Sequence, residues 1–119
     1  MALVSPNNLS TRGGMIARAC GTCPLGVHAT IGSADVLMFS GWAGGSVLVP
    51  ASVTNFTWHG SHDGITFSAI YDNAATAAAA TQAVTASTWV PIPDACFAFP
   101  FLKIVSAGAN GTATVVCKT

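Results

Sequence analysis

Residues 54–72, TNFTWHGSHDGITFSAIYD, decide the fold class of this chain. Side chains alternate between two faces along residues 54–59, where Thr54, Phe56 and Trp58 share one face. The second arm, residues 65–71, alternates in the same way and places four apolar side chains on one face: Ile65, Phe67, Ala69 and Tyr71. Alternation with a period of two on both sides of a glycine-containing turn is typical of a β-hairpin. We therefore expect two antiparallel strands in a half-buried sheet.

Short segments of the same kind continue on both sides of this hairpin, separated by glycine and proline residues. Asn110-Gly111 predicts a second hairpin, and we expect Trp58 and Trp89 to lie in the core. The pattern predicts an all-β chain, an antiparallel β-sandwich that is jelly-roll-like and has about eight strands. The expected strands cover residues 27–31, 36–40, 47–53, 54–59, 65–71, 82–85, 88–92, 99–106 and 112–118.

Residues 1–26 differ from the rest, because they are rich in Asn, Ser, Gly, Arg and Cys and show little periodicity. We expect an extended N-terminal arm over residues 1–26 and a β-sandwich domain over residues 27–119. The arm is either an edge strand followed by coil or a segment that reaches onto a neighbouring subunit, which would hold it in place. Residues 73–80, NAATAAAA, suit either a surface loop or a short helix, since their helix propensity is high but their length is marginal.

The composition favours association with other proteins. Of 119 residues 7% are charged, there is no Glu, and the formal net charge is zero. Soluble domains usually contain about 25% charged residues, and a neutral surface promotes association. We expect no nucleic-acid partner, since no basic run could neutralise phosphates. We also expect no membrane partner, because no run reaches the ~20 apolar residues of a span. The first residues lack the pattern of a secretory signal peptide, so we expect the chain to stay in the cytoplasm where it is made.

Candidate chemical groups are sparse, and we expect no enzyme activity, cofactor or metal. His59, His62 and Asp63 gather at one turn, where acid–base or metal chemistry competes with a purely geometric role for Asp63 and Gly64. Nothing resembles a nucleophile elbow or a phosphate-binding glycine loop. Of the four cysteines, Cys20 and Cys23 have a spacing that zinc sites use, but Cys96 and Cys117 do not form a second such pair. Free buried thiols are the preferred interpretation, and a disulfide or zinc are the alternatives.

Trp42 is flanked by glycines and is either an interface or sugar-stacking anchor or a partly buried loop residue. The candidate contact residues are Trp42, the two histidines His59 and His62, and the two arginines of the arm, Arg12 and Arg18.

Residues 45–119 are similar to the small β-sandwich virion proteins of tailed bacteriophages, which include capsid decoration (cement) proteins and head-fibre or tail accessory domains. The resemblance lies in the following segments: Ser61-His62-Asp63-Gly64-Ile65-Thr66-Phe67, Trp89-Val90-Pro91-Ile92-Pro93, Phe101-Leu102-Lys103-Ile104-Val105 and Gly111-Thr112-Ala113-Thr114-Val115.

This resemblance implies a non-enzymatic structural protein located in the virion and assembled in the host cytoplasm. It would bind the outside of an icosahedral head, bridge neighbouring major capsid subunits and form homo-oligomers, with a homotrimer the expected form. The alternative is a carbohydrate-binding or adhesion module of a phage fibre or tail, in which Trp42 and the His59–Asp63 turn recognise a glycan.

Overall fold

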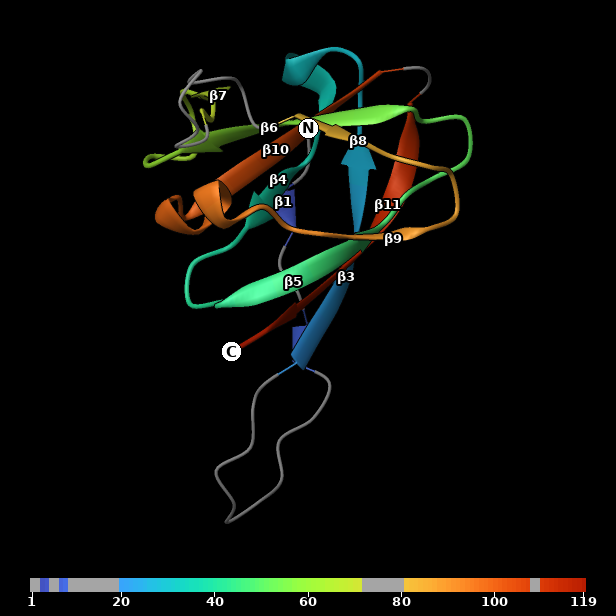
Figure 1. The fold of residues 1–119 in the computed structure, drawn as a ribbon. Helices are drawn as coiled ribbons and strands as arrows, with labels where there is room; N and C mark the ends of the chain where they lie inside the picture. Colours follow the sequence, from blue (N-terminus) through green and yellow to red (C-terminus); the bar gives the residue numbers. More distant parts are fainter. Residues whose placement is uncertain (1–2, 5–6, 9–19, 72–80, 108–109) are drawn as a thin grey trace.

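The structure is a computed structural model that describes residues 3–4, 7–8, 20–71, 81–107 and 110–119. Two β-sheets pack face to face (Figure 1), and the described residues contain two short 3₁₀ helices but no α-helix. No described helix has the length and apolar character needed to cross a lipid bilayer. The elements are β1 (Leu3–Val4), β2 (Asn7–Asn8), β3 (Cys20–Val27), η1 (Ile31–Ser33), β4 (Val36–Met38), β5 (Gly44–Leu48), β6 (Asn55–Ser61), β7 (Ser68–Ala69), β8 (Thr81–Ala83), β9 (Trp89–Pro91), η2 (Asp94–Ala98), β10 (Phe101–Ala107) and β11 (Gly111–Lys118).

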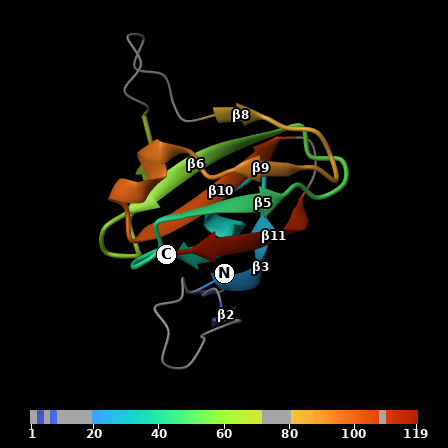
Figure 2. The ribbon, with the colours of Figure 1, turned by 60° about the horizontal axis from the view of Figure 1, so that its bottom comes forward.

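The strand order is that of a jelly roll. Sheet A contains the order β4-β10-β6-β8, and sheet B contains the order β3-β11-β5-β9. From β3 to β6 and from β8 to β11 each strand lies in the sheet opposite to that of the strand before it, whereas β6, β7 and β8 all lie in sheet A. This is the arrangement of an eight-stranded jelly roll. Figure 2 shows β9, β5, β11 and β3 of sheet B side by side. The two-residue strands β1, β2 and β7 extend this framework at the sheet edges. The expected β-sandwich is confirmed.

The core forms because each strand turns alternate side chains inward. In sheet B, Ala113 and Val115 of β11 are fully buried, whereas Thr112 and Thr114 are exposed. In sheet A, Phe56 and Trp58 of β6 are fully buried and pack edge to face at 6.5 Å between ring centroids. Trp58 therefore lies in the core, as expected.

A glutamine side chain joins the two sheets along one open side of the sandwich. Gln82 lies on β8 in sheet A, and its Oε1 accepts a hydrogen bond from the indole Nε1 of Trp58 at 2.9 Å. Its Nε2 donates to the carbonyl oxygen of Pro91, on β9 in sheet B, at 2.8 Å. A buried indole N–H needs such an acceptor, because an unsatisfied donor costs about 1–3 kcal/mol.

The expected boundary of the N-terminal arm is wrong for residues 20–26. These residues belong to β3, which pairs with β11 over eight positions from Cys20–Lys118 to Val27–Gly111. The Cys and Gly content of the segment hid its alternation, in which Cys23, Leu25 and Val27 point inward and are buried. Earlier in the chain, β1 pairs in parallel with β4 of sheet A, and β2 pairs with β3 of sheet B. Residues 9–19 and 72–80, which include the alanine-rich segment, lie outside the described residues.

Two hairpins were expected, and one is present. β6 and β7 pair as an antiparallel hairpin, although β7 is only two residues long and Ile65 and Tyr71 are exposed rather than half-buried. Asn110-Gly111 does not form a hairpin, because it connects β10 in sheet A to β11 in sheet B. The side chain of Asn110 instead accepts a hydrogen bond from the backbone N–H of Ala29 at 3.0 Å.

Candidate functional site

Trp42, the expected anchor residue, lies in the connection between β4 and β5. Its side chain is partly buried and packs against the hydrophobic core, and its backbone N–H donates to the carbonyl oxygen of Phe39 at 3.2 Å. This position matches the second of its two interpretations, a partly buried loop tryptophan. Two further expected contact residues, Arg12 and Arg18 of the N-terminal arm, lie outside the described residues.

His59, near the end of β6, and His62, directly after β6, have different surroundings. His59 is half-buried on the outer face of sheet A, in register with Lys103 on β10. Burial lowers the pKa of His59, a hydrogen bond to the Thr57 carbonyl oxygen opposes this, and the charge of Lys103 lowers the pKa further. His62 is exposed, and its ring lies 5.1 Å from the ring of Phe99. No hydrogen bond or ring contact within the described ranges connects Trp42 to either histidine.

Asp63 serves the geometry of the turn. Its Oδ1 accepts hydrogen bonds from the backbone N–H groups of Ile65 and Thr66 at 2.8 and 2.9 Å and from the Ser61 hydroxyl at 2.7 Å. These bonds lower the pKa of Asp63 from 3.8 to about 2, with the bond from Thr66 contributing most. Gly64 has φ of +78°, a conformation that glycine adopts without strain. The Ser-x-Asp-Gly pattern is therefore a structural motif in this chain.

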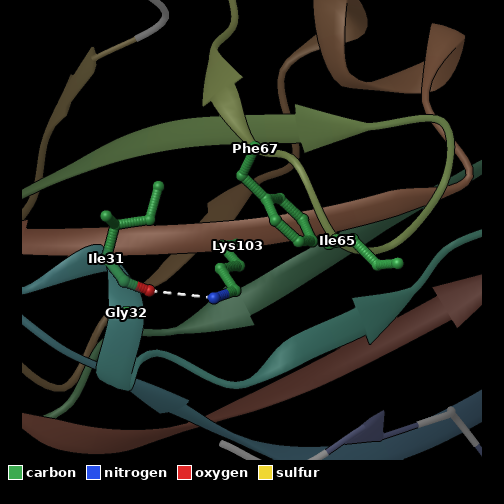
Figure 3. Close-up of a pocket in the computed structure, with 5 residues that line it drawn as sticks. All are labelled: Ile31, Gly32, Ile65, Phe67 and Lys103. Atoms are coloured by element: carbon green, nitrogen blue, oxygen red, sulfur yellow. Dashed lines mark hydrogen bonds between the residues drawn. The ribbon is translucent and has the colours of Figure 1, made fainter.

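The turn folds over the outer face of sheet A and covers a lysine. Lys103 points outward from β10, yet it is only 4% exposed. Its Nζ donates to the carbonyl oxygen of Ile31 in η1 at 2.9 Å and lies 4.8 Å from the centre of the Phe67 ring (Figure 3). Burial lowers the pKa of Lys103, and the nearby charge of Asp35 raises it. Chain segments on both sides thus cover the outer face of sheet A.

The outer face of sheet B carries no charged residue across its two central rows, and we call these rows the uncharged face. Neighbouring strands place their outward residues in register across four strands. Among them Trp89 is 53% exposed, so the expectation that Trp89 lies in the core is wrong. The next residue in the sequence, Val90, points inward and packs against the core. The two rows are Pro24, Thr114, Leu48 and Trp89, and Thr22, Val116, Ser46 and Pro91.

Three of the four cysteines, Cys23, Cys96 and Cys117, are buried and are not in disulfides, in agreement with the preferred interpretation. Burial raises the pKa of the Cys96 thiol to about 12 and also raises that of Cys23. Such thiols behave as small apolar groups. The described part of the chain contains no group of three His, Cys, Asp or Glu side chains placed to hold a metal ion.

Sequence reasoning missed the uncharged face and the buried lysine. The signal for Lys103 was present, since it is a single cation in the apolar strand Phe101–Ala107. The signal for the uncharged face was the complete lack of charged residues in β5 and β9.

Comparison with models of known protein families, with curated proteins and with solved structures found no match to this chain.

Proposed function

We propose that this chain is a non-enzymatic structural protein of a virion that binds the outside of an icosahedral capsid and bridges neighbouring major capsid subunits. The uncharged face is the observation that carries this proposal. Binding between proteins requires polar and charged groups to lose their water, which costs less where a surface has no charges. The face presents Trp89 and Leu48 side by side, and exposed tryptophan is a residue that commonly dominates binding energy at interfaces.

The fold is compatible with this role but does not determine it. Jelly rolls occur in viral capsid proteins and in lectins, and a fold alone does not define a function. The proposal that the chain is not an enzyme draws support from Asp63, whose carboxylate accepts hydrogen bonds within the turn. A trimer on the capsid would engage several such faces at once, so that each single contact could be weak.

A charge placed on the uncharged face tests the proposal. Thr114 is exposed at the centre of the face, and Thr114→Lys adds a cation that binding would bury. We expect binding to particles of the parent virus assembled without this protein to weaken about a hundredfold, the cost of about 3 kcal/mol for an unpaired charge at an interface.

The matched control is Thr66→Lys, which adds the same charge at an exposed position on the turn over sheet A. Cosedimentation with particles measures both variants, and thermal unfolding verifies that both are folded. Equal binding by Thr114→Lys and the unmodified chain would disprove a contact through this face.

A glycan-binding function is the second candidate, and the structure moves its focus from Trp42 to Trp89. Sugar rings stack on exposed aromatic faces, and Trp89 is exposed whereas Trp42 packs against the core. Under this alternative, Trp89→Ala abolishes binding on a glycan array and Trp42→Ala does not. Retention of particle binding by Trp89→Ala together with loss of glycan binding would favour this second function.

A further inference from the structure

A pocket of about 230 Å³ lies on the outer face of sheet A between η1 and the turn that follows β6. Figure 3 shows Ile31 and Gly32 on one side, Ile65 and Phe67 on the other, and Lys103 between them. Three of these side chains are apolar, and the only charged group among the five lining residues is the ammonium of Lys103. The pocket therefore combines an apolar wall with one buried cation.

The ammonium group has capacity for a further acceptor. A lysine carries three N–H donors, and the carbonyl oxygen of Ile31 accepts one of them at 2.9 Å. The ring of Phe67 stabilises the charge at 4.8 Å without accepting a conventional hydrogen bond. Within the described ranges, no further hydrogen-bond acceptor is recorded for Nζ. A cation that is 96% buried would gain from an anionic partner, since charge-assisted hydrogen bonds are stronger than neutral ones.

Asp35 affects the site from a distance. Its carboxylate accepts the backbone N–H of Gly26 at 2.8 Å. Burial lowers the pKa of Lys103, and the charge of Asp35 opposes this change. Its negative charge also reduces the attraction of the site for anions. A ligand with a single negative charge suits this balance better than a phosphate with two.

We propose that this pocket binds one carboxylate group carried on a short apolar stem. The carboxylate would accept hydrogen bonds from Lys103 Nζ, and the stem would pack between Ile31, Ile65 and Phe67. The volume is below the 300–1,000 Å³ typical of ligand pockets, so the site holds a small group rather than a large molecule. The carboxylate belongs either to a free short-chain acid or to an acidic side chain of a neighbouring polypeptide. The site is separate from the uncharged face, and its existence does not depend on the proposed function.

Titration with butyrate, followed by ¹H–¹⁵N NMR spectroscopy of the full chain, tests the proposal. We expect saturable shifts at the backbone amides of residues 31, 32, 65, 67 and 103, with butyramide as the uncharged control that produces no saturation. Lys103→Met keeps most of the apolar stem and removes the charge, so we expect binding to weaken at least about tenfold. Saturable binding that is equal for butyrate and butyramide, or equal in Lys103→Met, overturns the proposal.

A second variant guards against a loss of folding in Lys103→Met. A side chain added at Gly32 meets no atom within 4 Å, so Gly32→Leu adds bulk beside the pocket without breaking a packed contact. We expect it to weaken butyrate binding, whereas the control Gly44→Leu, which also meets open space but lies in β5 of sheet B, does not. Unchanged affinity in Gly32→Leu contradicts the assignment of the site.

Two ligands distinguish the sources of the carboxylate. Tighter binding of N-acetylglutamate N-methylamide than of butyrate supports an acidic side chain as the natural occupant. Tighter binding of butyrate supports a free acid. Failure of both to produce saturable shifts overturns the proposal.

Discussion

The two sheets of the sandwich differ in what lies against their outer faces. In sheet A, η1 and the turn that follows β6 cover β10, and they bury the outward-pointing Lys103 to 4% exposure. In sheet B, the outward residues of the uncharged face carry no charge, and Trp89 remains 53% exposed. Both sheets have the same number of strands in the jelly-roll framework. The two sheets therefore differ in their cover, because η1 and the turn after β6 lie over sheet A.

This difference shows how one fold can present a pocket on one side and a surface of strand residues on the other. The connections of sheet A are long enough to fold back and create a cavity with a defined charge. Among the described residues, alternate side chains of the strands form the outer surface of sheet B. We expect the first to select a small chemical group and the second to bind a broad protein surface.

The largest effect should come from a backbone contact inside sheet B. Gly45 faces inward on β5, where an added Cβ would overlap the backbone carbonyl oxygen of Val116 on β11. Because the neighbour is backbone, we expect Gly45→Ala to lower the free energy of unfolding by about 3 kcal/mol. Gly60→Ala in sheet A should cost less, since its overlap is with the Phe99 ring, a side chain.

Urea unfolding measures both variants, and Gly44→Ala is the control because its added Cβ meets no atom within 4 Å. A cost at Gly60 equal to or above that at Gly45 would contradict the tighter backbone approach in sheet B.

The connection between the sheets gives the next effect. Gln82→Met removes the acceptor of the buried Trp58 indole N–H, and we expect the free energy of unfolding to fall by about 2 kcal/mol. In a Trp58→Phe background the donor is absent, so the same change should cost clearly less. A double-mutant cycle by urea unfolding gives the coupling energy. A coupling energy near zero would show that the hydrogen bond from Trp58 to Gln82 does not contribute to the free energy of unfolding.

Replacing one aromatic residue by leucine on each sheet compares how much the two outer faces contribute to the free energy of unfolding. Phe67→Leu removes the aromatic face beside Lys103, and we expect a loss of about 1 kcal/mol. Trp89→Leu on the uncharged face should change the free energy of unfolding by no more than about 0.5 kcal/mol, because half of this side chain is already in solvent. If thermal unfolding gives the reverse order, the two faces do not differ as described.

The smallest expected effect concerns Asp63 in the turn that follows β6, and it appears in the pH dependence of unfolding. The pKa of Asp63 is lowered from 3.8 to about 2, so its contribution is complete above pH 3.8 and is lost as the pH falls through about 2. Asp63→Asn lacks this titration, and its urea midpoint should therefore vary less between pH 4 and pH 2. An identical pH dependence in both proteins would show that other groups control acid unfolding.

The sequence predicted the strands that alternate clearly and have normal lengths, such as residues 54–59 and 112–118, because period-two burial is local information. It did not predict β3, since the alternation of Cys23, Leu25 and Val27 is interrupted by glycine and proline. Asn110-Gly111 has hairpin residues, but only the tertiary arrangement decides that β10 and β11 belong to different sheets.

The candidate sites were less predictable than the fold. Trp89 was expected in the core as a strand tryptophan, like Trp58, yet its register with β5 turns it outward. The burial of Lys103 depends on η1 and the turn, which are distant in sequence from β10.

The positions of β10 and β11 have a consequence for how the molecule is made. Each of these late strands lies inside its sheet, with β10 between β4 and β6, and β11 between β3 and β5. Neither sheet can form completely before these two strands are synthesised. We therefore expect the apolar residues of the earlier strands to stay exposed to solvent until β11 has left the ribosome. We expect slow folding after synthesis, with protection by chaperones in the interval.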